Sequence, residues 1–152
     1  TSSKAFWRAT DEPARFGDAR GDAMKAILVV GAGGALGAMV RYLVFILANR
    51  LCGLNFPYGT IIVNVAGSLI LGVLIEALAL RWDVTAELRL FMVVGFLGAF
   101  TTFSAFSMDT VVLYERGRLD LCALYVSVSV VLSVGALFFG MAASRGMFLP
   151  KI

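Results

Sequence analysis

Long apolar runs separated by short polar breaks make up most of this chain. Each of four runs is close to the ~20 residues that a membrane-spanning helix needs. The pattern predicts an all-α integral membrane protein with four transmembrane helices in residues 25–146. A polar N-terminal tail (1–24) and a short C-terminal tail (147–152) flank them. The four runs are Ala26–Leu51, Gly59–Leu80, Leu88–Leu113 and Leu119–Ala143.

The breaks between the runs carry turn-forming and charged residues. Asn55–Gly59 contains Pro and Gly, Arg81–Asp83 surrounds a Trp, Glu115–Arg118 is charged around a Gly, and Arg145–Gly146 ends the last run. Basic residues near helix ends slightly favour placing both termini inside the cell. This weak bias is compatible with insertion in both orientations.

Composition narrows the function classes. The chain is 60% hydrophobic and 15% charged, and its mean hydropathy is +0.90, which indicates an integral membrane protein. The net charge of +3 is scattered, so no nucleic-acid surface is expected. Without His and with only Cys52 and Cys122, a zinc site has too few ligands. Unpaired thiols are favoured, and a disulfide between them is left open.

The glycine-rich start of the first run does not predict a nucleotide site. Ile27–Gly37 looks like a strand followed by a glycine loop, but Leu36 occupies the third glycine position of a dinucleotide fingerprint. The next segments are further apolar runs, so no enzyme of this type is expected. The first apolar run, which follows the polar tail, is too long for the core of a signal peptide and is not expected to be a secretory signal.

The third run contains the most informative stretch, Gly95–Phe106. Glycines, the hydroxyl residues Thr101, Thr102 and Ser104, and four phenylalanines are gathered there. Hydroxyl groups and a loosened backbone at this depth are costly unless they line a path enclosed by protein. The stretch therefore predicts that something polar enters the bilayer.

Three polar residues elsewhere in the runs have two interpretations each. Arg41 either snorkels or caps a helix end, or it attracts an anion into a vestibule. Asn64 is either an interhelical hydrogen-bond donor or an anion ligand. Glu76 lies late in the second run and is expected at the interface or in a polar cavity. A proton-coupled transporter would need such a carboxylate nearer the midplane.

The spacing of side chains predicts two helix faces that line the polar path. Tyr125, Ser129 and Ser133 recur every four residues and share one helix face. Phe103 and Phe106 also share a face. Such a pair commonly packs in a core, but here hydroxyl residues flank both rings, so we expect the rings to contact whatever passes. Ring edges carry partial positive charge and can stabilise a small anion.

Four short helices enclose a polar path most simply as a homodimer. Pairs of small residues allow close helix contact, either within one subunit or between two subunits. These pairs are Gly33 with Gly37, Gly67 with Gly72, Gly95 with Gly98, and Gly135 with Gly140.

These motifs resemble the small dual-topology fluoride channels of the Fluc or CrcB family. The resemblance extends from about Gly31 to Gly140. The matching stretches are Gly34–Tyr42, Gly59–Gly67 with Asn64, and Gly95–Ser107, of which the last is the most specific. One position departs from the pattern, because Ala105 stands where the family commonly has Thr.

The resemblance implies a fluoride-selective channel in a bacterial-type inner membrane, formed by an antiparallel homodimer with two pores. It implies passive fluoride efflux that lowers cytoplasmic fluoride. It also implies a third helix broken near Gly98–Thr101, where backbone carbonyls of Gly98 and Thr101 hold a structural Na⁺. The vestibule arginine is Arg41. The pore residues are Asn64, Thr102, Phe103, Ser104, Phe106, Tyr125, Ser129 and Ser133.

Two other functions remain as alternatives. A small four-span proton-coupled drug antiporter would use a carboxylate in its first helix, and Ala26–Leu51 contains none. A membrane assembly factor that transports nothing would not need so many polar residues at depth.

Overall fold

The described part of the chain, residues 19–80 and 84–148 of a computed structural model, is helical and contains no strand. Three of the helices are α2 (Ala19–Cys52), α3 (Tyr58–Leu80) and α7 (Leu119–Phe148). The remaining segment is divided into α4 (Ala86–Arg89), the π-helix η1 (Leu90–Leu97), α5 (Gly98–Phe100) and α6 (Phe103–Glu115). Four segments are long and apolar enough to cross a membrane, which confirms the predicted all-α fold with four spans. The protein is thus a multi-pass membrane protein.

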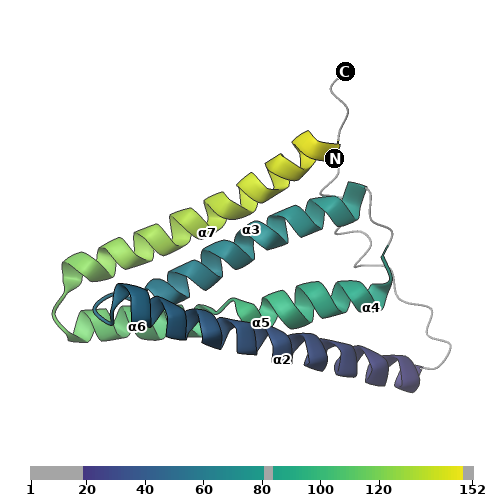
Figure 1. Cartoon of the computed structure of the whole chain (residues 1–152), viewed down its shortest axis with the longest axis horizontal. Helices are drawn as coiled ribbons and strands as arrows, with labels where there is room; N and C mark the ends of the chain where they lie inside the picture. The colour runs from purple at the N-terminus through teal and green to yellow at the C-terminus, as the bar shows by residue number, and fades with distance from the viewer. Residues whose placement is uncertain (1–18, 81–83, 149–152) are drawn as a thin grey trace.

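The helices form two pairs (Figure 1). α3 runs along α7, and α2 runs along η1 and α5. Contacts between α2 and α3 join the two pairs. α6 continues the third segment beyond the break and packs against α7 and α3. The core between the pairs is built around Val63, Leu97 and Phe100.

Glycine ends two of the helices, and the second of these ends lies in the predicted Glu115–Arg118 break. Gly53 (φ 80°) follows α2, and Gly117 (φ 71°) follows α6. Both are in the left-handed region, which costs glycine little. After α6 the amide of Gly117 donates to the carbonyl of Tyr114 (2.9 Å), and that of Arg118 donates to the carbonyl of Leu113 (3.1 Å). These bonds satisfy helix-end carbonyls and turn the chain into α7.

Close packing of glycine holds each pair together. A Cβ atom added at Gly33 or Gly37 of α2 would clash with backbone of η1. The same holds for Gly72 of α3 against α7, and for Gly140 of α7 against α3. Gly67 and Gly95 are equally close to neighbouring segments, so six of the eight predicted glycines are used for packing within one subunit. Two members differ: Gly135 has open space around its Cα, and Gly98 is exposed.

The break in the third segment lies at Thr101 and Thr102, at the C-terminal edge of the predicted Gly98–Thr101. Thr101 (ψ 159°) and Thr102 (φ −155°, ψ 118°) are extended, between α5 and α6. Thr102 is the N-cap of α6, and its side chain accepts a hydrogen bond from the amide of Ala105. The backbone therefore loses its helical bonds at this point.

Some predicted boundaries differ from the observed helices. α2 begins at Ala19, inside the predicted tail, and α7 continues past Arg145 to Phe148. The rest of the tail, the Arg81–Asp83 break with its Trp, and residues 149–152 lie outside the described residues.

Candidate ion path at the helix break

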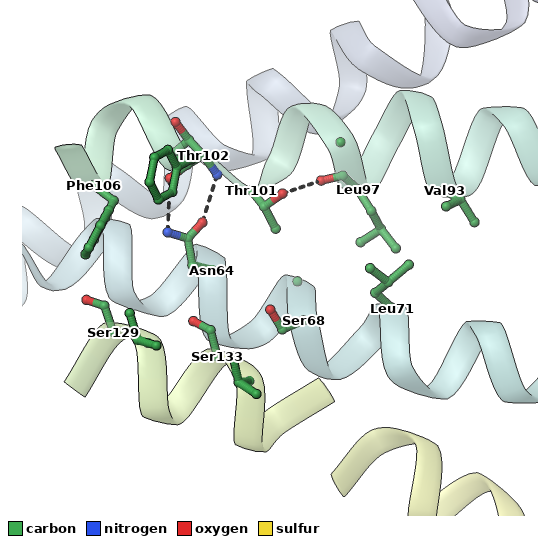
Figure 2. A pocket seen from close by; sticks show the side chains of 15 residues that line it. Asn64, Ser68, Leu71, Val93, Leu97, Thr101, Thr102, Phe106, Ser129 and Ser133 are labelled. Atoms are coloured by element: carbon green, nitrogen blue, oxygen red, sulfur yellow. Dashed lines mark hydrogen bonds between the residues drawn. The ribbon is translucent and has the colours of Figure 1, made fainter. Parts of the chain in front are cut away.

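A cavity of about 400 Å³ lies beside the helix break, between α3, the third segment and α7. Figure 2 shows Asn64 and Ser68 of α3 facing the break, with Ser129 and Ser133 of α7 on the far side. Most of the residues predicted from the sequence line this one cavity. They are Asn64, Gly98, Thr101, Thr102, Phe103, Phe106, Ser129 and Ser133. Ser104, Tyr125 and Arg41 do not line it.

Asn64 binds the backbone of the break through both atoms of its amide. Its Nδ2 donates to the carbonyl of Thr102 (3.1 Å), and its Oδ1 accepts from the amide of Thr102 (2.8 Å; Figure 2). Asn64 is therefore an interhelical hydrogen-bonding residue. One of its two N–H groups is used in this way, which leaves the second for another acceptor.

The hydroxyl groups at the break mostly bond to protein. The Thr101 hydroxyl donates to the carbonyl of Leu97 (2.9 Å). The Thr102 and Ser104 hydroxyl oxygens are 3.1 Å apart. Ser104 is exposed, at the first turn of α6. Ala105 has no hydroxyl, and its backbone amide donates a hydrogen bond to the Thr102 hydroxyl oxygen.

Arg41 of α2 reaches the break from the other side. Its Nη1 is 3.4 Å from the carbonyl oxygen of Thr101, and its side chain is half-buried. The long distance indicates a weak hydrogen bond. Arg41 therefore contacts the backbone where the third segment breaks, and it does not line the cavity.

The aromatic rings continue from the cavity toward α7. The Phe103 and Phe106 centroids are 5.3 Å apart, and those of Phe106 and Tyr125 are 5.4 Å apart. Phe103 is 77% exposed although it lines the cavity. One wall of the cavity is thus an aromatic ring that a single subunit leaves uncovered.

The α7 face contributes one unsatisfied polar group. Ser129 is 4% exposed, and among the described residues its Oγ forms no hydrogen bond of regular geometry, although the Tyr125 hydroxyl lies near it. Ser129 and Ser133 line the cavity, one turn apart. A buried hydroxyl without a partner is costly and needs an explanation, such as a ligand.

Tyr125 contacts a carboxylate that the sequence analysis missed. Its hydroxyl donates to Oδ2 of Asp109 (3.1 Å), which also accepts from Oγ1 of Thr60 (2.6 Å). Thr60 and Asp109 line a second cavity of about 220 Å³, which also includes Arg116. The available signal was a carboxylate inside the third apolar run, three residues after Phe106.

Glu76 lies away from both cavities. It is 1% exposed, and its carboxylate accepts from Arg145 Nε (2.8 Å) and Nη2 (3.1 Å). Next to Arg145, the Ser144 hydroxyl donates to the carbonyl of Val73 (3.3 Å). These bonds hold the C-terminal part of α7 to α3, so the contacts of Glu76 are structural.

Cys52 and Cys122 are not bonded to each other. Cys52 is exposed at the end of α2. The Cys122 thiol is 3.6 Å from the carbonyl of Thr110. The disulfide that the sequence left open does not form in this structure.

The chain matches a known protein family over most of its length. The family described as CrcB-like protein, Camphor Resistance (CrcB), matches residues 28–141. The chain is 50% identical over 122 residues to the fluoride-specific ion channel FluC of Agrobacterium fabrum, covering 80% of this chain and 98% of that protein.

Two further relatives have the same description. FluC of Cereibacter sphaeroides is 52% identical over 123 residues (81% of this chain, 97% of the relative). FluC of Nitrobacter winogradskyi is 50% identical over 119 residues (78% and 94%). Similarity of this extent over nearly the whole length of the relatives shows that the chain belongs to the CrcB family.

Proposed function

We propose that this protein is a fluoride-selective channel that allows passive fluoride efflux and so lowers cytoplasmic fluoride. The cavity at the helix break is the observation that carries the proposal. It combines the buried, unpartnered Ser129 hydroxyl with Asn64 and the Phe103 and Phe106 rings. Support from relatives comes from proteins about 50% identical that are named fluoride-specific ion channels.

The chemistry of the cavity suits a small, strongly hydrated anion. Such an ion exchanges its water shell for several donors, each weak enough to release it again. Ser129 and Ser133 supply O–H groups, and Asn64 retains one N–H. Ring edges of Phe103 and Phe106 add partial positive charge without a full cation that would trap the anion.

Efflux needs no coupled energy source in this proposal. A membrane potential that is negative inside drives an anion outward by about 2.3 kcal/mol per 100 mV. The protein acts as a channel and not as an enzyme.

The functional unit is an antiparallel homodimer of dual topology. Phe103, 77% exposed beside the cavity, and the exposed Gly98 both lie on a surface that a second copy would cover. A two-fold axis makes the two covered surfaces identical and gives two equivalent pores. The weak charge bias between the two ends of the helices fits insertion in both orientations.

A structural Na⁺ would bind at the dimer centre through the carbonyls of Gly98 and Thr101 of both subunits. Backbone carbonyl oxygens suit a hard monovalent cation, and a broken helix makes them accessible. The amides that would normally occupy these two carbonyls, those of Thr102 and Ala105, donate to side-chain oxygens instead. The residues present therefore fit such an ion.

The proposal is tested with purified protein in liposomes loaded with potassium fluoride. Valinomycin sets the membrane potential, and a fluoride electrode records release. We expect rapid fluoride release, little release from matched chloride-loaded vesicles, and no dependence on a pH gradient. Release that requires a proton gradient would instead support the antiporter, and no release above protein-free liposomes would contradict both.

A further inference from the structure

The carbonyls of Gly98 and Thr101 are freed by two particular side chains. In an α-helix each carbonyl accepts from the amide four residues later. For these two carbonyls the amides are those of Thr102 and Ala105. The Thr102 amide donates to Asn64 Oδ1 (2.8 Å), and the Ala105 amide donates to Thr102 Oγ1 (3.1 Å). One side-chain acceptor thus replaces each backbone acceptor.

Asn64 also fixes the direction of the chain at this point. Its Nδ2 donates to the carbonyl of Thr102 (3.1 Å), while its Oδ1 accepts from the amide of the same residue (Figure 2). We call these two hydrogen bonds, which hold both backbone polar groups of Thr102, the clamp. Thr102 is buried, at 9% exposure, and extended. Without the clamp, the Thr102 amide would lack a partner and would take its normal helical acceptor, the carbonyl of Gly98.

The Thr101 carbonyl keeps capacity for an ion. Among the described residues, Arg41 Nη1 approaches it at 3.4 Å. A carbonyl oxygen has two lone pairs, so this weak contact leaves one of them available.

We infer that Asn64 and Thr102 are positioning residues of the Na⁺ site, although neither needs to touch the ion. The inference rests on the proposed function, which includes that site. Asn64 then serves two ions at once: its free N–H faces the anion cavity, and its clamp on Thr102 leaves the Gly98 carbonyl for the cation. Substitutions at Asn64 should therefore weaken sodium binding as well as fluoride flux.

The test measures sodium binding to the purified full-length protein, independently of flux. Sodium retained after gel filtration into sodium-free potassium buffer is quantified by elemental analysis. A parallel NaCl titration at constant ionic strength follows the midpoint of the rise in melting temperature. The variants are Asn64→Leu, Thr102→Val, which is isosteric but lacks the acceptor, and Thr102→Ser, which restores it. Ser129→Ala is the control that alters the cavity but not the break.

We expect Asn64→Leu and Thr102→Val to lose retained sodium or to raise the titration midpoint roughly five- to tenfold, about the effect of one hydrogen bond. Thr102→Ser and Ser129→Ala should bind sodium like the unmodified protein. Unchanged binding in Thr102→Val and Asn64→Leu would overturn the inference, and Thr102→Val alone decides it if Asn64→Leu does not fold. An unmodified protein that neither retains nor responds to sodium would overturn the Na⁺ site itself, while its fluoride efflux would stand as a separate result.

Discussion

At the scale of single residues, the cavity combines satisfied and unsatisfied polar groups. Asn64 and Thr102 satisfy each other, whereas the buried Ser129 hydroxyl lacks a partner among the described residues. A protein that keeps such a group normally gains something other than stability from it. The residues of the cavity can therefore be separated experimentally into those that hold the fold and those that serve an ion.

Ser129 and Ser144 allow one such separation, because both serines are buried but only the Ser144 hydroxyl forms a hydrogen bond to the protein. Ser129→Ala should reduce fluoride flux severalfold without lowering the melting temperature, since it removes an unpaired hydroxyl. Ser144→Ala should leave flux unchanged but destabilise by about 1 kcal/mol, because its hydroxyl donates to the Val73 carbonyl. Thermal melts and liposome flux on both variants check this pair. A destabilised Ser129→Ala with normal flux would reverse the assignment.

Phe103 provides a second separation at this scale. Phe103→Ile removes the ring edge but keeps an apolar side chain, so flux should fall by about tenfold while the subunits stay associated. Phe138→Ile is the matched control, because Phe138 is 66% exposed, close to the 77% of Phe103, and does not line the cavity. Liposome flux and size-exclusion chromatography measure the two effects. Equal flux in both variants would remove Phe103 from the ion path.

At the scale of elements, the third segment depends on its neighbours for its shape. α2 contacts η1 and α5 through glycine, and α3 contributes Asn64 to the break. The segment passes from π-helix to α-helix to extended backbone within a few residues. Its geometry is therefore set by tertiary contacts more than by its own helix propensity.

Gly37 tests this dependence. Gly37→Ala should lower the melting temperature and the flux together, because the added Cβ meets the Phe96 carbonyl just before the break. Gly31→Ala, on the same helix with nothing within 4 Å of the added atom, should leave both unchanged or slightly raise stability. The same melts and flux assays apply. A tolerated Gly37→Ala would show that the third segment adapts without loss.

Hydrophobic patterning was enough to predict the four spans, because membrane-spanning helices need long apolar runs. The family resemblance placed the break near Gly98–Thr101, within a few residues of the extended Thr101 and Thr102. The two-bond clamp of Asn64 on Thr102 and the cluster around Asp109 were not predicted. Both join residues far apart in sequence, and their partners depend on how α3 and α6 are placed. The π-helix likewise has no local signal among its apolar residues.

At the scale of the whole molecule, one subunit leaves its cavity and its broken helix uncovered. Its cavity opens at an exposed phenylalanine, and the broken helix presents the exposed Gly98. The proposed antiparallel dimer completes both features with a second copy. This arrangement requires that equal numbers of subunits face each side of the membrane.

Cys52 allows that orientation to be counted. It is exposed at the end of α2, and Cys122→Ser removes the other thiol. In intact spheroplasts, a membrane-impermeant maleimide should label about half of the Cys52 population, with the rest labelled only after lysis, as two-fold antiparallel symmetry requires. A cysteine-free Cys52→Ser, Cys122→Ser variant gives the background. Complete labelling or none before lysis would establish a single orientation and contradict dual topology.

Passive conduction of fluoride by this protein sets the reversal potential of its current, which can be measured in a planar bilayer. With a fluoride gradient and equal chloride on both sides, we expect the current to reverse at the fluoride equilibrium potential. Adding a pH gradient should not move it, because no proton is coupled to the anion. A reversal potential that follows chloride, or that shifts with the pH gradient, would show that the protein is not a passive fluoride channel.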